Sequence, residues 1–150
     1  MNQSDSLTAP KWYWTVAGVA LVWNLLGCLA FLTELFAQET MMKEWTEEQK
    51  QWAKDIPTWI YFFYGIAVAT GVAGSAFLLM RKSWAIAAFA ISTVAIIIQM
   101  GYTMIVAGGL QIMGPTAAIM PCLVTTLSFV FLWFSFFAKG KGWMASSQDS

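Results

Sequence analysis

Residues 83–138 read SWAIAAFAISTVAIIIQMGYTMIVAGGLQIMGPTAAIMPCLVTTLSFVFLWFSFFA, and no charged side chain occurs among them. A membrane-spanning helix needs about 20 mainly apolar residues, because the hydrocarbon core of a bilayer is roughly 30 Å thick. The run is too long for one such helix and has the length of two helices with a short turn. Gly108-Gly109 and Gly114-Pro115 are the backbone-breaking residues within it. We therefore predict spans at 84–107 and 116–138.

Two further apolar runs precede this stretch, at 12–36 and 57–80, and the second ends at a pair of basic residues. Each run is long enough to cross a bilayer as a helix. Small or weakly polar residues recur along every run, and such residues let membrane helices pack closely. The sequence predicts an all-α membrane protein, a four-helix bundle forming one domain, with polar tails at 1–10 and 145–150.

The composition excludes several classes of protein. Hydrophobic residues make up 59% of the chain and charged residues 11%, whereas soluble domains carry about 25% charged residues. The eight Lys and Arg residues are scattered, so we expect no nucleic-acid partner. The chain has no histidine, which removes imidazole bases, histidine-ligated haem and histidine metal sites. The expected partner is the lipid bilayer, and we expect no cofactor and no metal.

The segment between the first two runs is polar and has the signature of a short helix. Thr46 and Gln49 have the spacing of a capping box, in which each side chain satisfies a backbone N–H of the other residue. Trp45, Trp52 and Ile56 then fall on one helical face. This predicts a short amphipathic helix at the outer membrane interface, acting either as a lid on the bundle or as a binding element.

The distribution of basic residues predicts the orientation. Short loops rich in Lys and Arg stay in the cytoplasm. A four-span arrangement gathers five basic residues on the side of both termini: Lys11, Arg81, Lys82, Lys139 and Lys141. The opposite side has three lysines among several acids. We therefore expect both termini to lie in the cytoplasm.

Two side-chain amides, Asn24 and Gln99, lie deep within the predicted spans. An amide in hydrocarbon needs hydrogen-bond partners, so both should point into the bundle. Tyr102 and Thr103 extend the face of Gln99, and Thr126 can meet it from the fourth span. One interpretation is a small polar cavity for a neutral solute. The alternative is that the two amides bond each other or backbone carbonyls and only fix helix register.

Several other residues each have two possible roles. Glu34 either reaches up to the outer interface or lies deep in a proton-linked site. Cys28 and Cys122 lie inside separate spans, where a free thiol is the default and a disulfide the alternative. Methionines also gather on the outer side, where they either fill gaps between helices or offer thioethers to a soft metal such as Cu(I). These are Met41, Met42, Met100, Met104, Met113 and Met120.

The chain resembles a family of small four-span bacterial inner-membrane proteins that is sometimes labelled sugar-transporter-like. The resembling stretches are KWYW at 11–14, LVWNLLG at 21–27, RKSWA at 81–85, QMGY at 99–102 and IMP at 119–121. The resemblance implies the four-span topology and a transport role. No nucleotide-binding loop, carboxylate pair or activated nucleophile is recognisable, so we expect no enzymatic activity. Two functions stay open: a transport unit for a neutral solute, assembled as a homo-oligomer, and an accessory or scaffolding subunit of a larger membrane complex.

Overall fold

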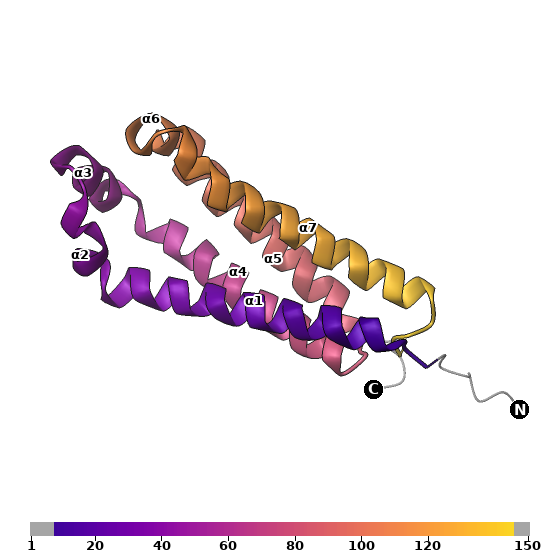
Figure 1. Ribbon diagram of the computed structural model, residues 1–150. Coiled ribbons are helices and arrows are strands. Elements are labelled where there is room, and N and C mark those ends of the chain that lie inside the picture. Colours follow the sequence, from indigo (N-terminus) through magenta and orange to yellow (C-terminus); the bar gives the residue numbers. More distant parts are fainter. Residues whose placement is uncertain (1–7, 146–150) are drawn as a thin grey trace, which may run out of the picture.

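The computed structural model describes residues 8–145, and four of its helical segments are long and apolar enough to cross a membrane (Figure 1). The chain is therefore a multi-pass membrane protein, and the predicted all-α four-helix fold is confirmed. The segments correspond to the predicted spans and comprise α1 (Lys11–Phe36), α4 (Thr58–Leu79), α5 (Trp84–Gly101) continued by η2 (Tyr102–Val106), and η3 (Pro115–Ala118) followed by α7 (Ile119–Gly140).

The long helices pack through their smallest residues. The face that α4 buries includes Ala67, Gly71 and Ser75, at a spacing of four residues. The facing helix α5 buries Ala88 and Ser92 in the same way. Lipid tails are as apolar as the helices, so close van der Waals contact at such small residues is what holds the pair together.

The helices form an open arrangement rather than a closed ring. Helix α1 packs on α4, α4 on α5, and α5 on α7, whereas α1 and α7 make no extensive contact. Figure 1 shows α1 and α7 meeting at the end that holds both termini and separating toward the other end. We call these two ends the terminal end and the lid end. The gap between α1 and α7 therefore widens from the terminal end to the lid end.

The hydrophobic core lies at the terminal end. Tyr13, Leu78, Phe131 and Phe134 are buried there in one cluster, and the Tyr13 hydroxyl donates a hydrogen bond to the carbonyl oxygen of Leu78. The ring of Trp12 lies edge-on against Phe134, with 5.8 Å between centroids. These contacts join α1 to both α4 and α7 and seal the terminal end with aromatic rings.

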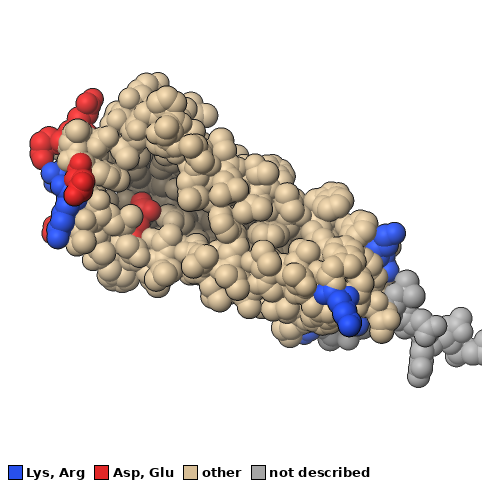
Figure 2. Space-filling model, viewed as in Figure 1, with Lys and Arg blue, Asp and Glu red and all other residues tan. Residues whose placement is uncertain are grey.

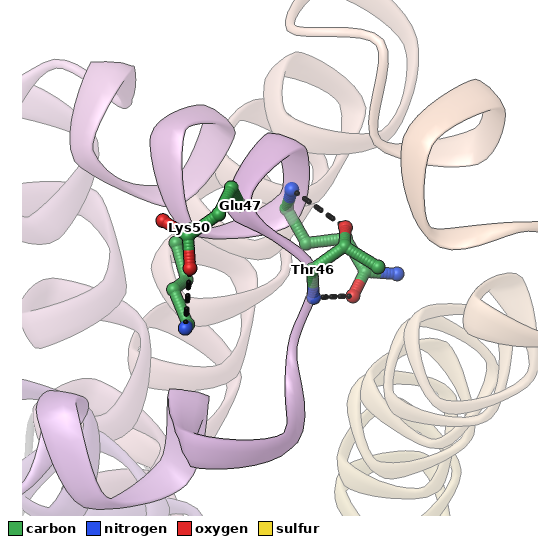
Figure 3. A network of polar contacts seen from close by, with 4 residues as sticks. Thr46, Glu47 and Lys50 are labelled. Atoms are coloured by element: carbon green, nitrogen blue, oxygen red, sulfur yellow. Dashed lines mark hydrogen bonds and ion pairs between the residues drawn. The ribbon is translucent and has the colours of Figure 1, made fainter.

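Four short helices form the lid end: α2 (Gln38–Met41), η1 (Met42–Glu44), α3 (Glu47–Asp55) and α6 (Gly109–Met113). The predicted amphipathic helix is confirmed as α3. Its capping box is complete, because the Gln49 backbone N–H donates to Thr46 Oγ1 at 3.3 Å and the Thr46 N–H donates to Gln49 Oε1 at 3.0 Å (Figure 3).

Residues 45–56, which comprise α3 and the residues next to it, form the lid. The lid is fixed to the turn that follows η2. The indole Nε1 of Trp52 donates to the backbone oxygen of Ala107 at 2.7 Å, which ties α3 to that turn. Gly108 is the N-cap residue of α6 and has a left-handed φ of 75°, and Gly109 approaches η2 so closely that a Cβ there would stand 2.6 Å from the Thr103 carbonyl oxygen. The predicted Gly-Gly and Gly-Pro break is thus required by backbone conformation and by close packing.

Candidate functional site

An inner cavity of about 360 Å³ lies between the four long helices. It begins where the aromatic seal ends, so the bundle is solid toward the terminal end and hollow beyond it. Most of its wall is apolar. The polar side chains that reach it are Asn24, Tyr64, Ser92, Gln99 and Ser128.

Asn24 connects α1 to α4 at the floor of this cavity. Its Nδ2 donates to the Ala20 carbonyl oxygen at 2.8 Å and to Ser75 Oγ at 3.1 Å. The carbonyl side of the amide rests on Gly71, where a Cβ would stand 2.1 Å from Asn24 Oδ1. Asn24 therefore has the register-fixing role that was one of its two predicted readings, and only Gly71 leaves it room.

Gln99 has a different environment. It is half-buried on α5 and lines both the inner cavity and a second, outer one. Within residues 8–145 its side-chain amide makes no hydrogen bond, and its partner is not Asn24. An amide in this position has two N–H donors and a carbonyl acceptor available to a ligand. Gln99 is therefore the better candidate for contact with a solute.

The outer cavity, of about 290 Å³, lies beneath the lid and adjoins the inner one, since Tyr64, Gln99, Met100 and Met120 line both. Trp45, Trp52 and Ile56 line it, so the apolar face of the lid covers the cavity. All six methionines that the sequence placed on the outer side belong to its wall: Met41, Met42, Met100, Met104, Met113 and Met120.

Glu34 lies in the wall of the outer cavity and is half-buried. Its two predicted interpretations, a side chain at the outer interface and one deep in a proton-linked site, both stay predictions. Figure 2 shows the hollow on the surface near the lid end, with acidic atoms inside it. The carboxylate makes no hydrogen bond or ion pair with any other residue in the described part of the chain. Among residues 8–145, Glu34 is also the only one with a formal charge that lines either cavity.

The structure separates the remaining predicted site residues. Thr103 is buried and lines the outer cavity, and its hydroxyl donates to the Gln99 backbone oxygen at 3.0 Å. Tyr102 lines neither cavity, and its ring lies against Trp59 with 5.0 Å between centroids. Thr126 is exposed on α7 and also lies outside both cavities.

Helical spacing explains why the structure brings Ser128 and Glu34 to the cavities. Ser128, two residues after Thr126, points the other way on α7 because each helical residue turns about 100°, and it reaches the inner cavity. Gly27, Ala30 and Glu34 follow one another at spacings of three and four, and all line a cavity. That spacing could have placed Glu34 on the inner face of α1.

Neither of the two cysteines forms a disulfide. Both Cys28 and Cys122 are free, and Cys122 is exposed. Figure 2 shows acidic and basic side chains together at the lid end, and only basic ones among the described side chains at the terminal end. On the outside of α3, the hydrogen bond from Lys50 Nζ to Glu47 at 2.8 Å, helped by the lysine charge, lowers the pKa of Glu47.

No family model, curated protein or solved structure matches this chain. The resemblance to the four-span bacterial family stays a prediction, and function must be argued from the cavities themselves.

Proposed function

We propose that the chain is a transport protein of a bacterial cytoplasmic membrane, moving a small solute through the cavity between its four helices. The observation that carries this proposal is the pair of adjoining cavities, which runs from the lid to the level of Asn24. The unpaired Gln99 amide lies where the two cavities meet. A solute entering beneath the lid would meet this amide on its way into the inner cavity.

The closed terminal end fits the same proposal. Transporters work by opening a midplane site to one side of the membrane at a time. The aromatic seal around Tyr13 and Phe134 blocks the terminal end, while the hollow opens near the lid. Such an arrangement corresponds to one of the two states that alternating access requires. The other state would part the seal, where α1 and α7 meet through ring contacts.

We place both termini in the cytoplasm. In residues 8–145 the terminal end has five basic residues and no acid, whereas the lid end has three basic residues and six acids. Positive charge favours the cytoplasmic side. A Gln49→Cys variant should therefore react with an impermeant thiol reagent in intact cells, and a Lys141→Cys variant should react only after lysis. The opposite pattern of labelling rejects this orientation.

Binding and passage, rather than catalysis, is the role we assign to the cavities. In the described part of the chain, Glu34 is the only formally charged residue that lines either cavity, and no second carboxylate or amine lines the wall with it. General acid–base chemistry needs a positioned proton donor or acceptor beside the reacting atoms, usually with a partner that tunes it. The amides of Asn24 and Gln99 supply hydrogen bonds without proton transfer.

A second candidate function is that of an accessory subunit in a larger membrane complex. The observation that favours it is the gap between α1 and α7 toward the lid end, where a helix of another protein, or of a second copy, could pack. Purification in a mild detergent distinguishes the two. A stoichiometric second polypeptide supports the accessory role, and a homo-oligomer or monomer that still transports solute rejects it.

Solute uptake into proteoliposomes tests the transport proposal. The panel should contain small neutral polyols, sugars and organic cations, each radiolabelled. Loss of one hydrogen bond to the solute costs about 1 kcal/mol, so Gln99→Leu should reduce uptake severalfold. Thr126→Val is the matched control, because Thr126 lies outside both cavities. Uptake that is absent for every solute, or equal in both variants, contradicts the proposal.

A further inference from the structure

The geometry points to the outer cavity as a binding site for an organic cation with an apolar body, in which Glu34 is the counter-ion. This inference rests on the proposed transport function and deepens it, because it names the class of solute. It replaces the neutral solute expected from the sequence, which left Glu34 out of the path.

Glu34 has no hydrogen-bonding or ion-pairing partner among residues 8–145. Its carboxyl group is half-buried in a wall made largely of apolar side chains, and no Lys or Arg of residues 8–145 lines either cavity. The ion pair found in residues 8–145, between Glu47 and Lys50, lies outside on α3. A charge in such surroundings is costly unless it is compensated. No side chain in residues 8–145 compensates it, so water, a proton or a cation must do so, and an organic cation is the one that the rest of the wall favours.

The aromatic residues favour a cation of organic type. Trp45, Trp52, Tyr61 and Tyr64 line the cavity together with Glu34. Aromatic faces attract cations, and clusters of them are the usual binding sites for quaternary ammonium groups. Both tyrosines are fixed by neighbours, Tyr61 through a 3.5 Å hydrogen bond from Gln38 and Tyr64 through its ring contact with Phe31. Side chains that are fixed before a ligand arrives lose less conformational entropy on binding, which favours affinity.

The methionines account for the apolar body. Methionine side chains are flexible and polarizable, and they adapt to ligands of irregular shape. The outer cavity that the six methionines line has a volume of about 290 Å³. That volume is close to the lower end of the range for small-molecule sites, about 300–1,000 Å³. A cavity of this size lined by six methionines therefore suits the apolar part of an organic ligand.

The position of the cavity suits an amphiphile. It lies at the lid end, close to the membrane interface, and its neighbour extends between α1 and α7, which do not close against each other. A ligand can thus place its charged group near Glu34 and its apolar part among the methionines. Gln99, at the junction, remains available to bond a polar substituent.

Equilibrium dialysis of the full chain in maltoside micelles tests this inference. The probes are benzyltrimethylammonium and its neutral isostere neopentylbenzene, with protein-free micelles to subtract partitioning. We expect saturable binding of the cation and at least tenfold weaker binding of the isostere. Glu34→Gln should weaken cation binding at least tenfold and leave the isostere unchanged. The matched control is Glu39→Gln, on the exposed surface of α2, which should bind like the unaltered protein.

A second variant protects the test against misfolding. Trp45→Leu keeps the wall apolar but removes an aromatic face, so it should weaken the cation more than the isostere. Equal binding of the two probes, or no effect of Glu34→Gln, overturns the inference. Uptake of a neutral solute without cation binding rejects the cation site and leaves transport standing. Cation binding without uptake of any solute rejects transport and leaves the site standing.

Discussion

Gly71→Ala is the substitution whose consequence follows most directly from the structure. A methyl group at position 71 would stand 2.1 Å from Oδ1 and 2.9 Å from Cγ of Asn24, distances that no side chain tolerates. The Asn24 amide must rotate away, which breaks its hydrogen bonds to Ser75 Oγ and to the Ala20 carbonyl oxygen. The interface between α1 and α4 is then overpacked, and it lacks the hydrogen bond between Asn24 and Ser75.

The expected size of the effect is the balance of three terms. Overpacking a tight interface costs about 1–3 kcal/mol, and an interhelical hydrogen bond in a membrane protein contributes about 0.6 kcal/mol. Alanine gains about 1 kcal/mol over glycine in a helix interior. We therefore expect Gly71→Ala to lower the free energy of unfolding by about 1–2 kcal/mol. Gly18→Ala makes the same chemical change where no atom lies within 4 Å, so it should be neutral or stabilising.

Unfolding by SDS in mixed micelles, followed by circular dichroism, measures these differences. The double variant Asn24→Ala with Gly71→Ala provides the internal check, because removing the amide removes the clash. Gly71→Ala should cost much less in the Asn24→Ala background than in the native one. If Gly71→Ala is as harmless as Gly18→Ala, or costs the same in both backgrounds, the described contact between Asn24 and Gly71 is wrong.

Three further predictions concern the lid and the terminal end. Gly109→Ala places a Cβ 2.6 Å from a backbone oxygen of the π-helical turn, so it should loosen the lid by about 1–3 kcal/mol and speed amide exchange in α3. Tyr13→Phe removes the buried hydrogen bond to α4 and should lower stability by about 1 kcal/mol, measured by SDS unfolding, whereas Tyr102→Phe should have little effect. The depressed pKa of Glu47 means that its link to Lys50 contributes above the ordinary carboxyl pKa and is lost as the pH falls through the folded value. Lys50→Ala should raise the pKa of Glu47 in a carboxyl NMR titration, and an unchanged value would contradict that contact.

The elements of the fold were predictable because they depend on local signals. Apolar length defines a membrane helix, and positions 108–115 combine glycine and proline at the break between the last two spans. The capping box of Thr46 and Gln49 is complete within four residues. None of these signals requires knowledge of how one helix is rotated against another.

The details of the site depend on that rotation and were harder to predict. Asn24 bonds Ser75 rather than Gln99 because Gly71 lets α1 approach α4, a fact of packing between distant segments. Thr126 and Ser128 are equally polar, and only the packing of α7 on α5 decides which one faces inward. The depth of an apolar span likewise says nothing about whether Glu34 turns toward lipid or toward a cavity.

Access of water to position 99 is the direct test of a solute path through the bundle. Gln99→Cys and Ile97→Cys, each placed in a chain with Cys28→Ala and Cys122→Ala, differ little in depth, but position 99 lines both cavities and Ile97 is exposed on the outer face of α5. Thiol reagents react with the thiolate, which requires contact with water. We predict rapid labelling of Gln99→Cys by a water-soluble methanethiosulfonate added from the lid side, and no labelling of Ile97→Cys. Equal resistance of both positions would contradict a solute path through the bundle.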